Sequence, residues 1–449
     1  MRRKQLSATE YLTELLDAIA AENATLHAFI DVYRADALGA ARDADERVAR
    51  GIPCGPLQGL PFAVKDLIDV QGQPTTAQSR LLLDNIARRD ATVVRRMRDA
   101  GAILVGKLAL EEFGIGSPAD LLPWPPALNP WDIGRTPGGS SSGCGVALAA
   151  GQIPLAIGTD TAGSVRNPAA MCGVIGLKPS YDLISRRGVF PLSPSLDHVG
   201  VMARSAEDCS LLLDAVRRRP RRPDPISFGA EDSRPLHGLR LGMLTQFYER
   251  DLPADDATRA ALATAADLLS GLGAHLEEVE TTDLQSYRRC GAVILQWEAF
   301  QIHRRTLSRS PEHYGARCRE ELLKGATIQA ADYREAQRHR RSLSLDIDRL
   351  LETSDLLMTG VSPEPAFRMD DADGPTRSGN GMRIVFNVTG HPALSFCVGF
   401  SEQGLPIGGQ LVGRRHQEST LLTVAAAYQR ATGWHRRQPA FSTEHPQHS

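Results

Sequence analysis

Residues 153 to 170, IPLAIGTDTAGSVRNPAA, pass from an apolar run into a glycine-containing turn and then into the start of a helix. The run IPLAIG is typical of a buried strand, and Pro168 suits the first turn of a helix. Between them, the backbone N–H groups of TDTAGS can converge on one point beside Ser164, as in an oxyanion hole. An ordinary strand-to-helix turn with a capping serine explains the same residues, so this segment alone fixes only the local fold.

The chain around this segment alternates strand-like and helix-like runs, which favours a layered α/β fold. LPFAVKDLIDV is an apolar, branched run, and ATVVRRMRDAGAILVGKL reads as a helix, a glycine and a second strand. Ser7 and Glu10 form a capping-box pattern at the first helix. We divide the chain into an N-terminal helical layer (1–55), a core with the candidate site (56–216), an Arg- and Pro-rich connector returning to the core (217–245), a helical excursion forming part of the substrate pocket (246–350) and a C-terminal part of the core (351–449).

The composition narrows the classes of partner. With 449 residues, 42% of them hydrophobic, the chain can bury a large core, and its net charge of −2 gives no overall basic field for nucleic acid or an anionic membrane. No run of about 18 apolar residues predicts a membrane span, and the N-terminus lacks the apolar core of an export signal. The seven cysteines are scattered singly, as expected of reduced thiols in the cytoplasm. A small neutral or mildly polar ligand fits best.

Lys65 lies inside the apolar run LPFAVKDLIDV. It can be an edge-strand lysine whose head reaches water, or a desolvated lysine whose lowered pKa lets the neutral amine act as a base. The two interpretations stay open on this segment alone.

PGGSSSGCG, residues 137 to 145, is a second unusual stretch. Its G-x-S-x-G pattern formally matches a nucleophile elbow with Ser141 as nucleophile, but a polar loop with two prolines precedes it where the elbow needs a buried strand. The same residues can also form a flexible linker or a phosphate-binding loop. The phosphate-binding interpretation is weakened because no Gly-Lys-Ser/Thr ending follows. A serine beside an N–H nest needs a base, and a lysine with a second serine is a chemically allowed partner set.

With these segments in view, the sequence resembles the amidase signature family of Ser/cis-Ser/Lys amidohydrolases. The matching segments are GLPFAVKDLIDV, NPWDIGRTPGGSSSG, LAIGTDTAGSVRNPAAMCGVIGLKPS and GHPALSFCVGFSEQGLPIGGQLVG. The resemblance implies an α/β/α layered fold with a mixed central sheet surrounded by many helices. It also implies a hydrolase acting on carbon–nitrogen bonds other than peptide bonds, with no metal or organic cofactor.

The family's catalytic residues transfer by position to Lys65, Ser140 and Ser164. Ser164 would be the nucleophile, and Ser140, joined to Gly139 by a cis peptide bond, would pass its proton to Lys65. The resemblance further implies an oxyanion hole from the backbone of Thr161, Ala162, Gly163 and Ser164, with Gly139, Ser141, Asp160 and Arg166 in supporting roles.

The resemblance leaves the substrate open among amides, anilides, carbamates or urethanes, urea-like compounds and glutamine. DTAGS and SRRGVFPLSPSLDHVG are similar to bacterial amidases that act on small carboxylated urea derivatives, such as carboxybiuret hydrolases. Trp124, in a proline-rich loop, is a candidate substrate-binding residue for an apolar leaving group. The alternative is the glutamine-hydrolysing subunit of a tRNA-dependent amidotransferase. A non-catalytic binding protein is disfavoured because all three triad positions are present, and a homodimer is expected from the resemblance.

Overall fold

The computed structural model describes residues 6–115, 122–218, 235–371, 373–379 and 381–440. Across these ranges, eleven strands form one mixed sheet in the order β1-β3-β2-β4-β6-β5-β10-β11-β9-β7-β8. The strands are β1 (Phe29–Val32), β2 (Pro61–Lys65), β3 (Ile103–Leu108), β4 (Leu155–Asp160), β5 (Ile175–Lys178), β6 (His198–Ala203), β7 (Arg240–Met243), β8 (His275–Glu278), β9 (Leu356–Gly360), β10 (Ala393–Phe400) and β11 (Pro406–Gly413).

The directions of the strands decide where the chain leaves the sheet. β2 lies between β3 and β4 and runs parallel to both, whereas β6 pairs antiparallel with β4. Parallel neighbours end at the same edge of a sheet. Lys65, the last residue of β2, and Asp160, the last residue of β4, therefore reach the same edge of the sheet.

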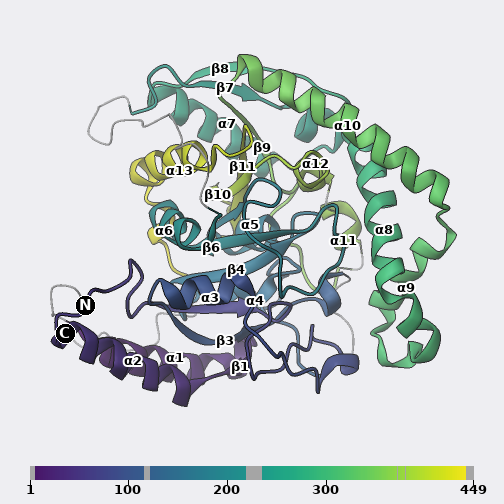
Figure 1. Cartoon of the computed structure of the whole chain (residues 1–449). Coiled ribbons are helices and arrows are strands. Elements are labelled where there is room, and N and C mark those ends of the chain that lie inside the picture. The colour runs from purple at the N-terminus through teal and green to yellow at the C-terminus, as the bar shows by residue number, and fades with distance from the viewer. Residues whose placement is uncertain (1–5, 116–121, 219–234, 372, 380, 441–449) are drawn as a thin grey trace.

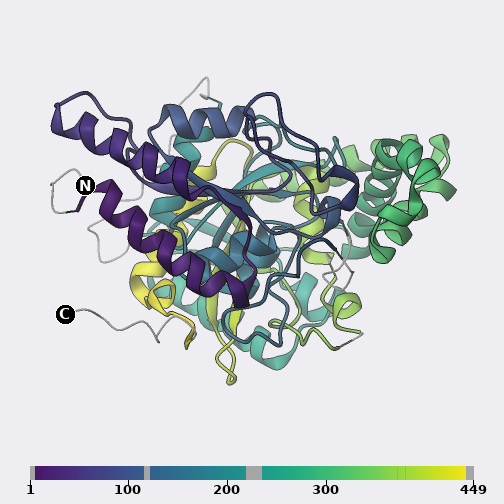
Figure 2. The same cartoon turned by 90° about the horizontal axis from the view of Figure 1, so that it is seen from below.

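Helices cover both faces of this sheet (Figures 1 and 2). Ala63 and Ala156 face a layer that includes α1, α2 and α4, whereas the next residues, Val64 and Ile157, face a layer that includes α3, α6 and α13. Alternate residues of a strand point to opposite faces, so both faces of β2 and β4 are buried. This arrangement confirms the expected α/β/α fold with a mixed sheet. The helices are α1 (Ala8–Leu26), α2 (Arg34–Ala49), α3 (Thr92–Asp99), α4 (Ser142–Ala149), α5 (Arg166–Cys172), α6 (Ala206–Val216), α7 (Asp256–Gly271), α8 (Leu284–Arg309), α9 (Ala316–Lys324), α10 (Ala330–Thr353), α11 (Gly374–Ser378), α12 (Gly381–Thr389) and α13 (Glu418–Thr432).

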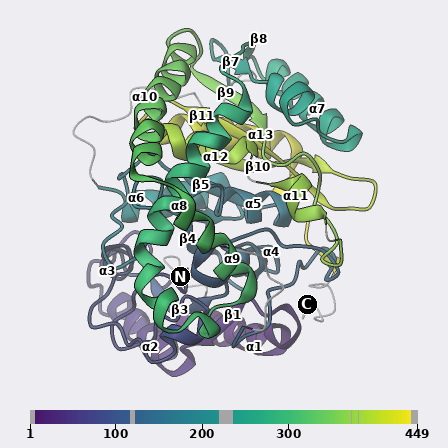
Figure 3. The same ribbon diagram turned by 90° about the vertical axis from the view of Figure 1, so that its right-hand side faces the viewer.

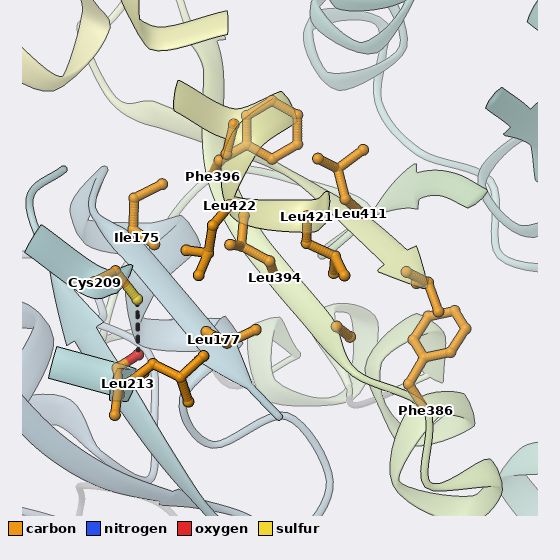
Figure 4. Close-up of a cluster of buried hydrophobic side chains, with 14 of the residues drawn as sticks. Ile175, Leu177, Cys209, Leu213, Phe386, Leu394, Phe396, Leu411, Leu421 and Leu422 are labelled. Atoms are coloured by element: carbon orange, nitrogen blue, oxygen red, sulfur yellow. Dashed lines mark hydrogen bonds between the residues drawn. The ribbon is translucent and has the colours of Figure 1, made fainter. Parts of the chain in front are cut away.

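The largest core runs along the sheet from β2 to β7 and includes side chains of α3, α6, α7 and α13, and Figure 4 shows part of it. Aliphatic and aromatic side chains of neighbouring antiparallel strands interdigitate there with those of α6 and α13, and almost no water reaches them. They include Ile175 and Leu177 of β5, Leu394 and Phe396 of β10, Leu411 of β11, Leu213 of α6, and Leu421 and Leu422 of α13. Burying this much apolar surface holds β10 and β11 against the strands that carry the candidate site.

The helices α8, α9 and α10 lie along one side of the molecule, in front of the sheet in Figure 3. α8 packs against α9, α10 and α12. Gly291 of α8 permits the contact with α12, since a Cβ there would lie 2.5 Å from Cδ1 of Ile384. α8 is thereby held close to the C-terminal part of the core.

Two strands depart from the sequence interpretation. β1 lies inside the region expected to be a helical layer and pairs antiparallel with β3, and β8 lies inside the excursion expected to be helical and pairs parallel with β7. Both have only four residues and contribute little apolar surface: in β8 three of the four are exposed. The connector expected at residues 217–245 lies partly outside the described residues, because 219–234 are not among them.

Candidate active site

Ser164 lies in the turn that joins β4 to α5. All six residues of β4 are buried, so the strand holds the start of the turn firmly. Gly163 has a φ of 116°, and a Cβ there would lie 2.6 Å from Cβ of Arg383. Only glycine fits this backbone next to α12. Ser164 itself is partly exposed at the surface of a pocket.

The carboxylate of Asp160 holds the turn together. It accepts hydrogen bonds from the amides of Gly163 (2.8 Å) and Val165 (3.2 Å) and forms an ion pair of 3.0 Å with Arg166. Asn387 of α12 donates to the same carboxylate at 2.8 Å. Burial favours the neutral acid, but Arg166, Lys178 and the Asn387 amide together outweigh it and hold the pKa of Asp160 below its ordinary value. The pair of Asp160 and Arg166 is fully buried and lies at the two ends of the turn that carries Ser164.

Lys65 ends β2 and is completely buried. Its Nζ lies 2.8 Å from Oγ of Ser140 and 2.9 Å from Oγ1 of Thr159, and no carboxylate lies within 4.0 Å of it among the described residues. Burial lowers the pKa of Lys65 to about 8. β2 is an interior strand and Lys65 is buried, so the alternative of an edge-strand lysine whose head reaches water is wrong.

The serines after Gly139 take different roles. The Gly139–Ser140 peptide bond is cis, and Ser140 lies against Lys65. Ser141 is fully buried, donates from its hydroxyl to the carbonyl of Thr159 (3.1 Å) and from its amide to the carbonyl of Ser164 (3.1 Å). A hydroxyl enclosed in this way cannot attack a substrate, so the elbow interpretation of Ser141 is wrong. Ser141 instead fixes the backbone of Ser164.

A cavity of about 580 Å³ opens beside these residues. Ser140 and Ser164 both line it, although no hydrogen bond joins their hydroxyls in the described part of the chain. Thr161, Ala162, Gly139 and Asn167 line the same side, and α8, α9 and α12 supply much of the opposite wall. The structure therefore brings Lys65, Ser140 and Ser164 to one site, with the two serine hydroxyls not yet in contact.

The backbone amides expected to bind an oxyanion lie in the same turn. The Gly163 amide donates to Asp160, whereas no hydrogen bond from the amides of Thr161, Ala162 or Ser164 is found within the described ranges. The φ of Ala162 is not positive, so its methyl group is accommodated without the left-handed conformation that favours glycine. Of the four amides expected to bind the oxyanion, that of Gly163 is thus the one that already donates a hydrogen bond within the described residues.

Trp124 does not line this cavity. Together with Leu16 and Ile19 of α1 and Phe29 of β1, it lines a second cavity of about 490 Å³. The proline-rich loop carries its side chain toward the N-terminal helices, so the expected substrate contact does not form.

Sequence reasoning missed two charged residues beside the site. Glu111 lines the cavity, and burial raises its pKa to about 7 against the opposing effects of Lys65 and Arg383. Arg383 is 4% exposed and donates to the carbonyls of Val361 and Gly379. The pair Glu111 and Glu112 after β3 was a signal, but no pattern indicates which of the two faces the cavity.

A model of the amidase family matches residues 10–422. The chain belongs to the amidase family. The family expected from the four motif segments is therefore confirmed, and amidases act on carbon–nitrogen bonds.

The relatives of this amidase carry different activities. A glutamyl-tRNA(Gln) amidotransferase subunit from Azoarcus sp. (strain BH72) is 37% identical over 474 residues, which cover 97% of each chain. A solved structure of a vestigial protein complex linked to the origins of an s-triazine catabolic enzyme has 33% identity and a TM-score of 0.86, covering 96% of both chains. The peptide amidase of Stenotrophomonas maltophilia has 30% identity and a TM-score of 0.84, covering 99% of this chain and 97% of that one.

Three further features concern the described residues as a whole. None of the seven cysteines forms a disulfide, and six are buried. Searched over the described ranges, the amidase has no helix with the length and apolar character to cross a membrane. The same ranges contain no group of histidine, cysteine and carboxylate side chains arranged to hold a metal ion.

Proposed function

We propose that this amidase is a serine amidohydrolase that cleaves the C–N bond, other than a peptide bond, of a small amide, carbamate or urea-like substrate. The observation that carries the proposal is the 2.8 Å contact of Lys65 Nζ with Ser140 Oγ, buried at a cavity that Ser164 also lines. A lysine without a carboxylate partner and with a pKa near 8 is suited to accept a proton.

The first half of the reaction forms an acyl-enzyme. Neutral Lys65 accepts the proton of Ser140 as Ser140 accepts that of Ser164, while Thr159 receives a hydrogen bond from the amine. Ser164 Oγ then bonds to the substrate carbonyl carbon. The oxyanion is bound by the amides of Thr161, Ala162 and Ser164, and Gly163 acts by positioning them through Asp160.

The second half releases both products. The C–N bond breaks as the leaving amine takes the proton back from Lys65 through Ser140, and water then hydrolyses the ester on Ser164. This scheme uses no metal or organic cofactor. It requires the Ser164 hydroxyl to turn toward Ser140 when substrate binds, since catalytic hydrogen bonds often tighten only in the complex.

The test is covalent labelling with single substitutions. A fluorophosphonate should form an adduct located at Ser164 by mass spectrometry, and Ser164→Ala should form none. Lys65→Ala should label slowly although its thermal unfolding stays cooperative. An unlabelled Ser164 in folded protein, or comparable amide turnover by Ser164→Ala, would contradict the assignment.

A second candidate function is the glutamine-hydrolysing subunit of a tRNA-dependent amidotransferase. It is favoured by the 37% identity to the Azoarcus amidotransferase protein over 97% of the chain. In that case companion subunits should copurify with the protein, and ammonia release from glutamine should rise when tRNA is added. An isolated chain that hydrolyses small amides at full rate without companion subunits or tRNA supports the first proposal.

We also propose that the amidase is a homodimer located in the cytoplasm. Size-exclusion chromatography with light scattering tests the homodimer.

A further inference from the structure

The wall of the cavity opposite Ser164 is formed largely by one face of α8. Its cavity-lining residues recur at intervals of three and four, so they share that face. They include Gln285, Arg288, Ala292, Leu295 and Gln296, with Arg289 beside them. Apart from the two aliphatic side chains, this face offers hydrogen-bond donors to whatever fills the cavity.

The charges that line the cavity are unbalanced. Five cationic side chains and two carboxylates line it. The cations are Arg288, Arg289, Arg317, Lys324 and Arg383, and the carboxylates are Glu111 and Glu321. Lys324 is paired with Glu321 at 2.6 Å. With a pKa of about 7, Glu111 is largely neutral below neutral pH.

The two cations on α8 have no acidic partner. Arg288 is half-buried and Arg289 is exposed, and neither forms an ion pair with any described residue. A guanidinium drawn partly out of water lacks full hydration, and its planar fork matches the two oxygens of a carboxylate. Arg288, on the same helical face as Gln285 and Ala292, is therefore available to a ligand in the cavity.

We propose that the substrate is an anionic amide whose carboxylate is bound by Arg288 while its C–N bond lies at Ser164. Arg289 and Arg317 add positive potential at the same wall. This inference rests on the proposed hydrolase function and names its substrate class. The cavity of about 580 Å³ limits the substrate to a small molecule.

The test compares matched amides. The ω-amides of short dicarboxylic acids, from malonamate to adipamate, are measured against their methyl esters and against the corresponding ω-amino amides. We expect kcat/KM to be about 10- to 100-fold higher for at least one acid than for its ester, as for a charge-assisted hydrogen bond. Glutaramate should exceed glutamine, which adds an ammonium group, and added KCl should reduce the preference for the acid.

Variants connect the preference to Arg288. Arg288→Gln should reduce the ratio of acid to ester turnover by about 10- to 100-fold, chiefly through KM. Arg305→Gln, an exposed position on α8 away from the cavity, should keep the wild-type ratio. The labelling rate of Ser164 with a neutral fluorophosphonate reports whether each variant is folded.

The outcomes separate the two proposals. Equal turnover of acids and esters by an enzyme labelled at Ser164 overturns the anionic substrate and leaves the hydrolase intact. An unchanged ratio in Arg288→Gln overturns the assignment of the carboxylate to Arg288. A preference for glutamine over glutaramate would mean that the cavity also binds the ammonium group, and this would contradict a substrate recognised as an anion. Absence of both labelling and turnover removes the hydrolase and this inference with it.

Discussion

The Asp160 carboxylate accepts a hydrogen bond of 2.8 Å from the Gly163 amide and so closes a loop of three peptide units. The same carboxylate binds Arg166, the first residue of α5. Asp160 therefore joins the end of β4 to the start of the following helix, and the turn with Ser164 lies between these two fixed points.

Replacing Asp160 by asparagine should destabilise the protein strongly. Asn keeps the shape but leaves the Arg166 guanidinium, which is 0% exposed, without its counter-charge. We expect the free energy of unfolding to fall by about 3–5 kcal/mol in urea titrations. Asp17→Asn, which removes an exposed pair of 2.7 Å with Arg34, should change it by less than about 1 kcal/mol. Equal effects of the two substitutions would contradict the role given to Asp160.

Gly163→Ala should reduce activity by displacing the turn. Its methyl group would lie 2.6 Å from Cβ of Arg383, at a φ of 116° that alanine disfavours. A displacement of about 1 Å at a reacting group costs about 10²-fold in rate, and we expect kcat/KM to fall by that order. Gly404→Ala is the control, because its φ is also positive but no atom lies within 4 Å of the added Cβ. Full activity of Gly163→Ala would show that the turn tolerates the shift.

Lys65→Arg should be inactive although it preserves the charge. Arginine can still donate to Ser140 and Thr159, but its guanidinium cannot lose a proton near neutral pH. Loss of a general base lowers the rate by about 10²- to 10⁴-fold, and steady-state kcat/KM on a small amide measures this. Activity close to wild type would mean that Lys65 acts only as a cationic hydrogen-bond donor.

The pH dependence should report the pKa of Lys65. In the proposed mechanism the reactive form is the neutral amine, so kcat/KM should rise with pH and level off above about 8. Below that value it should fall about tenfold per pH unit.

Glu111→Gln should move this acidic limb to lower pH. Burial has the largest effect on the pKa of Lys65 and lowers it, whereas the negative charge of Glu111 is among the effects that raise it. Without that charge the amine loses its proton more easily. Glu207→Gln, a surface residue paired with Arg430 at 3.0 Å, should leave the pH profile unchanged. An acidic limb that moves to higher pH would contradict the coupling between Glu111 and Lys65.

Local pattern was sufficient for the local structure around each motif. It predicted an apolar strand at Lys65 and a strand-to-helix turn at Ser164, and the predicted capping box of Ser7 and Glu10 is present in α1. Only the resemblance to the amidase family assigned these residues to one site. The parallel pairing of β2 with β4, which brings the ends of these segments together, is not visible in any of them.

Long-range contacts explain what was missed. Asn387 donates to the backbone carbonyl of Asp160 from 227 residues further along the chain, and no spacing rule connects such positions. Thr159 looks like an ordinary strand residue until Lys65 is placed beside it. The strand β1 was missed because FIDV is short and lies between two helical patterns, so its pairing with β3 depends on tertiary packing.

The contact of Arg383 with Gly163 has a consequence for synthesis on the ribosome. A nascent chain that ends before α12 already contains Lys65, Ser140 and Ser164, but it lacks both Arg383 and Asn387, which close the turn from the other side. Because proteins emerge from their N-terminus and domains fold as units, the machinery for amide cleavage is completed only when most of the chain has left the ribosome. A chain that ends before α12 is therefore expected to hold the turn of Ser164 from the β4 side alone.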